Sequence, residues 1–316
     1  MLEPTLMRSP HPLLLLLLIA MTPLRASASP HGVVPSHYKE IHVKPSTFAA
    51  KGGVLGRTIT VWLSPVLAKD PAHAQKLLRE RGRLLVLHDN QIMWDGHDAP
   101  HGGIRINHTA EAMVRRGELP PLIVVGIPNA GPGRIAEFAG RIAGDPRRQK
   151  AYEHYVVHDV LPAVRAALPY APGADKTYSA GVSYGADAAL SVVLRHPDKF
   201  AGAAVLSGYR KFGPHTSTVE PIAKLLASKP PAKRPRLLIG TGLADHHERD
   251  HQGELGKLVK LLVGAGYNVT EHPQHYRATS SDKTLHVFTD PPAQHNELSW
   301  RAQMGQWVLP FVGQNL

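Results

Sequence analysis

Residues 176–190 read KTYSAGVSYGADAAL, and this stretch decides the fold. Its first residues suit a β-strand, its last residues favour a helix, and Ser183 lies between Gly181 and Gly185 at the junction. A sharp turn from strand to helix needs glycine at both places, because side chains there would collide with neighbouring backbone. The pattern therefore predicts a turn that exposes the Ser183 hydroxyl above a sheet, followed by a helix that aims the backbone N–H of Tyr184 at a developing negative charge.

Four further stretches have the form of buried parallel strands, since each is a continuous apolar run that ends in small or polar residues. They are RLLVLHD (83–89), PLIVVGIPN (121–129), AGAAVLSG (201–208) and RPRLLIGTG (234–242), with a last strand at TLHVFTD (284–290). Helical periodicity is found at 109–118, 151–168, 185–197, 253–266 and 298–311. Two alternating stretches, 37–43 and 57–64, flank a glycine-rich turn and predict an antiparallel opening pair. The order of elements predicts an α/β fold, with a mostly parallel central sheet and helices on both faces.

The first 28 residues have the composition of a secretory signal peptide. The apolar run LLLLLLIA (13–20) follows Arg8 and precedes the small residues of 26–28, which suit a cleavage site. This run is shorter than the roughly 20 apolar residues that a membrane-spanning helix needs. We therefore expect an exported protein without stable membrane insertion after the signal is removed. The rest of the 316-residue chain, 29–316, is 288 residues long and is expected to form one domain.

Composition excludes several classes of site. The chain has no cysteine, which rules out a thiol nucleophile and thiolate metal ligands. Its formal net charge of +11 favours anionic envelope surfaces or acidic ligands. The lysines and arginines are scattered, and the one dense run, 228–236, is interrupted by prolines, so we expect no nucleic-acid partner. The oligomeric state is not indicated.

A serine hydroxyl is a poor nucleophile by itself and needs a base and an orienting carboxylate. When the serine lies on a strand-to-helix turn, the acid and then the histidine follow it in the chain. His295 lies in a loop after the strand 284–290 and just before the last helix, whereas His286 lies inside that strand and His272 before it. His295 is therefore the candidate base.

Three carboxylates follow the strand 234–242. Asp245 comes first, nearest the strand end, and is the candidate acid; Glu248 and Asp250 are alternatives that would otherwise be solvated acids at a helix start. The same segment contains His246, His247 and His251. Histidines four apart on a helix can share a face, but no second ligand cluster accompanies them, so we expect neither a metal nor another cofactor.

The loop 88–96, HDNQIMWDG, offers a second donor for an oxyanion. The backbone N–H of Gln91 is the candidate, beside that of Tyr184. Met93 and Trp94 in this loop either line a pocket for an acyl or aromatic group or cap the core.

Six segments together carry a family resemblance. They are RLLVLHDNQIMW (83–94), RRGELPPLIVVGIPN (115–129), GRIAEF (133–138), GVSYGADAALSVVLRHPDKFAGAAVLSG (181–208), GTGLAD (240–245) and QHNELSW (294–300). They resemble the esterase D and enterochelin esterase group of α/β-hydrolases, which is also similar to mycolyltransferases and feruloyl esterases. The resemblance implies an α/β-hydrolase fold.

The resemblance implies a role for matching residues. Ser183 matches the nucleophile, His295 the base and Asp245 the acid, and the backbones of Gln91 and Tyr184 match the oxyanion hole.

Arg134 and Glu137 match a loop pair that lies close to the active-site side in members of this family, so the resemblance adds these two residues to Trp94 as candidates for substrate binding. Two departures from the family pattern, Asp89-Asn90 for Asp-Gly and Ala293-Gln294 for Gly-Gly, reshape the pocket without removing a reacting side chain.

These observations predict an exported serine hydrolase that cleaves carboxylic esters of a small molecule or a polysaccharide. The alternatives are a siderophore trilactone esterase, a feruloyl or acetyl-xylan esterase, and an acyltransferase that admits an alcohol in place of water. A catalytically inactive envelope binding protein is the alternative of another class.

Overall fold

Nine strands form the central sheet of this computed structural model. The structure describes residues 37–314 apart from 69–70, 97–98, 141, 169, 210, 213–215, 218–221, 223–224, 227–233, 273 and 277–283. The strands are β1 (Tyr38–Val43), β2 (Arg57–Leu63), β3 (Arg83–His88), β4 (Leu122–Ile127), β5 (Thr177–Val182), β6 (Gly202–Leu206), β9 (Arg236–Gly242), β10 (Asn268–Glu271) and β11 (Thr284–Asp290). A separate two-stranded pair consists of β7 (Lys211–Phe212) and β8 (Thr216–Ser217). The expected signal peptide lies outside the described residues.

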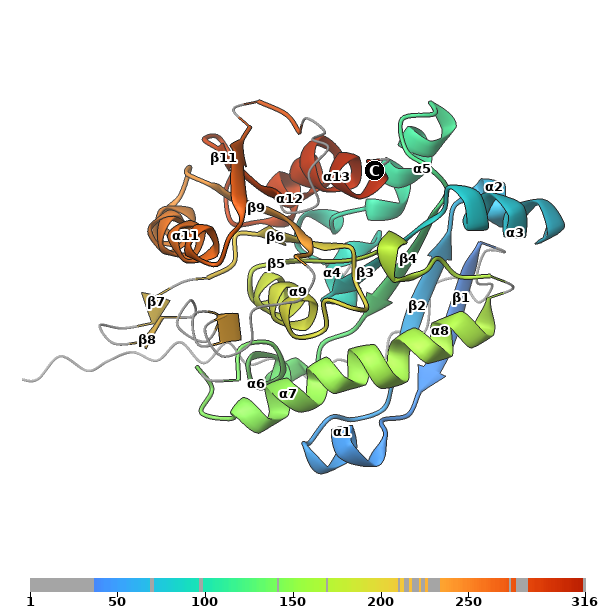
Figure 1. The fold of residues 1–316 in the computed structure, drawn as a ribbon, viewed down its shortest axis with the longest axis horizontal. Helices are drawn as coiled ribbons and strands as arrows, with labels where there is room; N and C mark the ends of the chain where they lie inside the picture. The colour runs from blue at the N-terminus through green and yellow to red at the C-terminus, as the bar shows by residue number, and fades with distance from the viewer. Residues whose placement is uncertain are drawn as a thin grey trace, which may run out of the picture. The chain divides into compact units, whose positions relative to one another are not determined.

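The sheet has the order β1-β2-β4-β3-β5-β6-β9-β11-β10 (Figure 1). β1 pairs with β2 and β2 with β4 in antiparallel fashion, and all other pairs are parallel. The carboxyl ends of the seven parallel strands therefore meet at one edge, where ligands bind in open α/β sheets. This edge holds Ser183 after β5 and His295 after β11.

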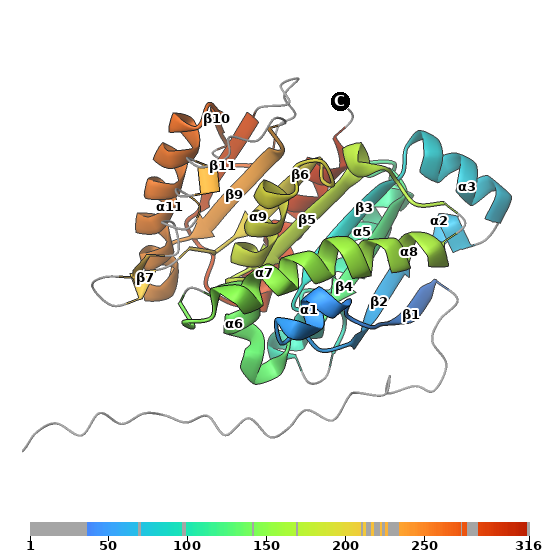
Figure 2. The same cartoon turned by 60° about the horizontal axis from the view of Figure 1, so that its bottom comes forward.

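Helices cover both faces of the sheet (Figures 1 and 2). One face packs against α1 (Thr47–Lys51), α2 (Pro65–Ala68), α3 (Pro71–Glu80), α7 (Pro146–His154), α8 (Leu161–Ala167), α9 (Tyr184–Arg195) and α11 (His246–Gly264). The other packs against α4 (Asn90–Met93), α5 (Ile106–Arg115), α12 (Glu297–Gln303) and α13 (Leu309–Gly313). The remaining described helical segments are α6 (Arg134–Phe138) and the short turns η1 (Pro100–Gly102), η2 (Gly131–Gly133) and η4 (Ala174–Lys176). Two buried apolar clusters result, one on each side of the strands.

Two long helices widen into π-helical turns, at η3 (Tyr155–Val160) between α7 and α8 and at η5 (Met304–Val308) between α12 and α13. A proline follows each turn within two residues, Pro162 in the first helix and Pro310 in the second. Proline lacks the N–H for an intrahelical bond and its ring clashes with the carbonyl four residues before it. The wider turn relieves that clash and lets both helices continue.

The α/β prediction is confirmed, and so is the antiparallel opening pair. Three details differ. The connection between β1 and β2 contains α1, because Thr47–Lys51 turn a buried alanine toward the core. α11 begins at His246, seven residues earlier than the periodicity indicated, because Asp245 caps it. β10 was not predicted, since this four-residue edge strand is largely exposed and has no apolar run.

None of the helices in the described part of the chain has the length and apolar character of a membrane span.

Candidate active site

The turn after β5 has the strained geometry that the two glycines predict. Ser183 has φ 54° and ψ −131°, a conformation that side chains rarely adopt. A Cβ on Gly181 would lie 2.1 Å from the carbonyl oxygen of Gly185, and one on Gly185 would lie 2.9 Å from Oδ2 of Asp89. The Ser183 N–H donates to the carbonyl of Leu206 at 2.9 Å, which ties the turn to β6. The turn therefore presents the serine at the start of α9.

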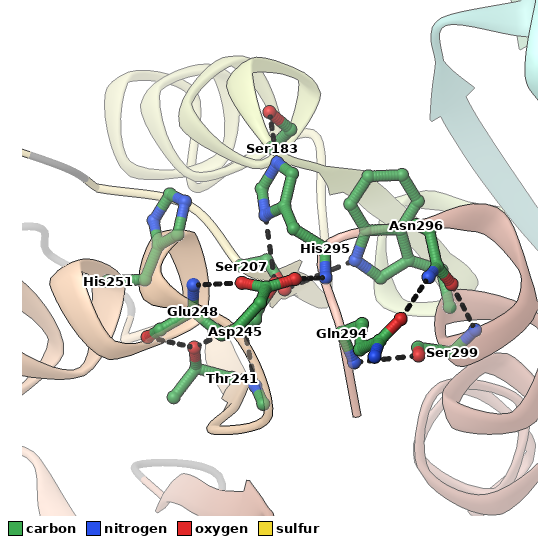
Figure 3. A network of polar contacts seen from close by, with 12 residues as sticks. Ser183, Ser207, Thr241, Asp245, Glu248, His251, Gln294, His295, Asn296 and Ser299 are labelled. Atoms are coloured by element: carbon green, nitrogen blue, oxygen red, sulfur yellow. Dashed lines mark hydrogen bonds and ion pairs between the residues drawn. The ribbon is translucent and has the colours of Figure 1, made fainter. Parts of the chain in front are cut away.

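His295 reaches this serine from the loop between β11 and α12. Its Nε2 lies 3.1 Å from Oγ of Ser183 (Figure 3). The loop is close to the end of β9, where a Cβ on Gly242 would lie 2.2 Å from the carbonyl oxygen of Ala293. Asn296 caps α12 by accepting from the N–H of Ser299 at 3.1 Å. The structure thus joins Ser183 and His295, as the sequence predicted.

The acid at the histidine is Glu248, and the prediction that Asp245 orients the ring is wrong. Oε1 of Glu248 lies 2.8 Å from Nδ1 of His295. Asp245 instead accepts two backbone bonds: Oδ1 caps α11 by accepting from the N–H of Glu248 at 2.9 Å, and Oδ2 accepts from the N–H of His295 at 2.8 Å. The N-cap geometry directs this carboxylate to backbone donors, while Glu248, one turn further on, faces the ring. Asp250, the other alternative, is exposed on α11.

Glu248 is buried, and both of its carboxylate oxygens accept hydrogen bonds. Its Oε2 accepts from Oγ1 of Thr241 at 2.7 Å and from the N–H of Gly242 at 2.7 Å. The Ser207 hydroxyl is a further donor to it. Burial by itself raises the pKa of this carboxyl, but the hydrogen bonds from His295, Thr241, Ser207 and Gly242 outweigh burial and lower the pKa to about 2. An ionised Glu248 can only accept, so Nδ1 of His295 carries the proton and Nε2 accepts from the Ser183 hydroxyl.

This depressed pKa predicts a loss of stability in acid. The pKa of Glu248 is lower in the folded chain than its ordinary value of 4.5, so its stabilisation is present above about pH 5 and is lost as the pH falls toward 2. Its full contribution is on the order of 3 kcal/mol. Urea unfolding at a series of pH values should show a shallower acid dependence for Glu248→Gln than for the wild type. Asp250→Asn, which removes an exposed carboxylate of the same helix, is the matched control. Equal slopes for Glu248→Gln and the wild type would contradict the assignment.

The turn after β3 lies beside the turn after β5, because these strands pair directly. Asp89 there has φ 64° and precedes α4, which contains Gln91. The side-chain amide of Gln91 bridges the backbone of Asn129, accepting at 3.1 Å and donating at 3.3 Å. The Asn129 amide donates to Oδ1 of Asp89 at 2.6 Å. The Gln91 backbone and the first residue of α9, Tyr184, thus belong to two adjacent, braced turns.

The three residues predicted to bind substrate occupy different environments. Arg134 holds Asp89 by two bonds of 2.6 Å each and places its guanidinium 5.2 Å from the centre of the Tyr184 ring. Glu137 is fully buried and makes a two-pronged ion pair with Arg57, at 2.8 and 3.0 Å. The Glu137 carboxylate therefore faces the protein interior and is paired with a guanidinium there.

Trp94 at the end of α4 packs toward the sheet. Its indole N–H donates to the side chain of Asn90, its ring meets that of Tyr38 edge to face at 5.8 Å, and its neighbour Met93 is fully buried. Met93 belongs to the apolar cluster on this face of the sheet, and the partly buried Trp94 packs against that cluster. No group of three or more histidine or acidic side chains in the described ranges could hold a metal ion.

Sequence reasoning missed four residues around the site, namely Ser207, Thr241, His251 and Trp300. The indole N–H of Trp300 donates to Oγ of Ser207 at 3.1 Å, and the Trp300 ring meets His295 edge to face at 4.9 Å. A usable signal existed for two of them, because Ser207 and Thr241 occupy the ends of the predicted strands 201–208 and 234–242. Trp300 is the last residue of the family-like segment 294–300, whereas no local pattern distinguishes His251, within α11, from a core residue.

A family model with the description “Putative esterase” matches residues 86–310, a range that includes Ser183, Glu248 and His295. Among curated proteins, no relative matches the chain.

Solved structures of esterases share the fold. The enterobactin esterase of Shigella flexneri is 18% identical with a TM-score of 0.56, and the match covers 87% of this chain and 57% of that one. An IroE-like serine hydrolase from Shewanella oneidensis is 13% identical with a TM-score of 0.56, covering 87% and 78%. The feruloyl esterase module from Clostridium thermocellum, solved as a complex with sinapinate, is 15% identical with a TM-score of 0.57, covering 88% and 89%. This chain therefore spans just over half the length of the enterobactin esterase, and the likeness confirms the predicted α/β-hydrolase fold.

Proposed function

We propose that this chain, which belongs to the family described as “Putative esterase”, hydrolyses carboxylic esters by way of a covalent acyl-enzyme formed on Ser183. One observation carries the proposal: Ser183, His295 and Glu248 form a continuous hydrogen-bonded series, with distances of 3.1 and 2.8 Å. A serine, a base within hydrogen-bond reach of it and a buried acid that orients the base are the parts that nucleophilic catalysis requires.

In the first half of the reaction, Oγ of Ser183 attacks the acyl carbon and its proton passes to Nε2 of His295. The ionised Glu248 stabilises the imidazolium that results and keeps the proton on Nδ1. The carbonyl oxygen becomes an anion, and in this proposal it accepts from the backbone N–H groups of Tyr184 and Gln91, which belong to the two adjacent turns. The intermediate collapses when Nε2–H protonates the leaving alcohol.

In the second half, water attacks the acyl carbon and gives a proton to Nε2, after which Ser183 leaves with that proton. The acid is released and the serine is regenerated. Each step uses groups already present in the site, so the proposal requires neither a metal nor a cofactor.

Labelling with a fluorophosphonate tests the proposal directly, because the probe phosphonylates only an activated serine. We expect a single adduct on the peptide that contains Ser183, and none in Ser183→Ala. Ser46→Ala is the matched control, since Ser46 hydrogen-bonds Asp159 away from the site. A folded wild-type protein that takes no label would contradict the esterase proposal and support the alternative of an inactive binding protein.

The acyl and alcohol parts of the substrate are assigned by a panel of esters. It contains acetyl, feruloyl and catecholate trilactone esters, each assayed with and without an added alcohol. We expect release of free acid to exceed formation of the new ester, as a hydrolase requires. A product mixture dominated by the new ester would favour the acyltransferase alternative.

We also propose that the chain is exported, on the basis of the leucine-rich segment after Arg8. Cell fractionation followed by mass analysis of the mature N-terminus checks this. The expected mature protein begins near residue 29. A full-length protein retained in the cytoplasm would contradict it.

A further inference from the structure

We infer that His251 is a positioning residue for the proposed base: its ring stacks on the imidazole of His295 and holds it in the plane that joins Ser183 to Glu248. This inference rests on the proposed function and deepens it. The two rings are parallel within 2°, and their centres lie 4.9 Å apart. His251 is 1% exposed, so its ring is held inside the protein.

The ring of His251 is itself fixed. Its Nδ1 lies 2.9 Å from the carbonyl oxygen of Gly208, in the loop after β6. A carbonyl can only accept, so Nδ1 of His251 is the donor. The residues on either side of Gly208, Ser207 and Tyr209, have positive φ of 52° and 60°, and the Tyr209 N–H donates to buried Asp187 at 3.0 Å. This loop therefore fixes the orientation of the His251 ring that packs against His295.

Three residues of α11 and its cap hold His295 at three different places. Asp245 accepts from its backbone N–H, Glu248 accepts from Nδ1, and the His251 ring packs parallel to its imidazole. These residues are three apart in the sequence, and positions at that spacing lie on one side of a helix. A single bond at Nδ1 leaves the ring able to tilt about it, and the stack with His251 restrains this tilt together with the edge-to-face contact of Trp300.

A tilt of His295 would lengthen the bond between Nε2 and Oγ of Ser183, on which proton transfer depends. Misplacement by about 1 Å can cost a factor of about 100 in rate. Substrate binding does not require the histidine to be aligned, so loss of the stack is expected to act on kcat and not on KM.

Two variants distinguish the contribution of the His251 ring from that of its hydrogen bond to Gly208. His251→Phe keeps an aromatic face but loses the bond to Gly208, whereas His251→Gln keeps an amide donor but loses the ring. We expect kcat to fall about 10- to 100-fold in His251→Gln, with KM changed less than about twofold, and His251→Phe to retain kcat within about threefold. The second-order rate of fluorophosphonate labelling should fall in parallel with kcat.

Leu258→Ala is the matched control, because Leu258 is fully buried on the same helix and its loss weakens the fold without a contact to His295. It should keep kcat. Unchanged kcat in His251→Gln, or equal losses in His251→Gln and His251→Phe, would overturn the inference.

A measurement on the wild type is independent of whether variants fold. Nuclear Overhauser contacts between the ring protons of His251 and His295 are expected from the stack, and their absence would overturn the inference. Failure of the proposed function is distinguished by Ser183→Ala: if that variant keeps its activity, the esterase mechanism fails, whereas a dead Ser183→Ala beside a fully active His251→Gln overturns only the role of His251.

Discussion

His295→Ala is expected to hydrolyse esters at least about 10⁵-fold more slowly than the wild type, with most of the loss in kcat. Without the imidazole, no group accepts the proton of Ser183 or returns one to the leaving alcohol. The fold should persist, because the bond from Asp245 goes to the backbone N–H of residue 295 and survives the substitution. Steady-state kinetics on an activated ester, with circular dichroism to verify folding, makes the measurement.

Non-additivity sharpens this test. When two residues act together in one step, removing the second after the first causes no further loss. The kcat of Ser183→Ala/His295→Ala should therefore be no lower than that of the slower single variant. A further loss of several orders of magnitude in the double variant would contradict a shared proton path. Added imidazole offers a second check, because the space vacated between Glu248, His251 and Trp300 suits such a ring. Partial recovery of His295→Ala, and none of Ser183→Ala, is the expected result.

The second large effect on kcat is expected from substitution of Glu248, the carboxylate at His295. Glu248→Gln is expected to lower kcat about 10³- to 10⁴-fold, while the isosteric change Asp245→Asn lowers it by about tenfold or less. A glutamine amide can donate to Nδ1 of His295, which would move the ring proton to Nε2. In that tautomer Nε2 can no longer accept from Ser183. Asp245 acts on backbone N–H groups only, so an amide oxygen can replace part of its function.

Parallel kinetics of the two variants decide between the acids. Thermal unfolding of both is the control, because each loses a hydrogen-bonded carboxylate near the start of α11. Should Asp245→Asn prove the more damaging to kcat, the assignment of Glu248 would be contradicted and the first sequence expectation restored.

The different roles of Asp245 and Glu248 show where sequence reasoning stops. The turn around Ser183 could be predicted because its requirement is local: two glycines, a serine and the elements on either side. The acid depends on where α11 begins, and apolar periodicity marked only its later turns. Asp-x-x-Glu before a helix is a known start signal, and it was present at Asp245 and Glu248. Applied there, it would have assigned Asp245 to the cap, but it would also have directed Glu248 back to the cap N–H, whereas the structure places Glu248 at His295.

Other contacts near the site could not be predicted from any local pattern in the sequence. The ion pair of Glu137 with Arg57 joins residues 80 apart in the chain, and nothing near either residue indicates that both are buried. The stack of His251 on His295 joins residues 44 apart. Both contacts follow from the order of the strands: the first depends on β2 and β4 being neighbours, and the second on β9 and β11 being neighbours.

The sheet order also sets when activity can begin during synthesis. The nucleophile and its turn are complete once β6 has paired with β5, about two thirds of the way along the chain. β11 lies between β9 and β10 and is the last described strand in chain order, so His295, which follows it, is made after all the strands of the central sheet. Domains build up as the chain emerges, and a nascent chain stopped before residue 295 would contain a serine turn with no means of activating it. If Ser183 and His295 act as proposed, a chain that lacks β11 and the loop after it would be unable to react with esters, and activity would begin only when these residues have joined the sheet.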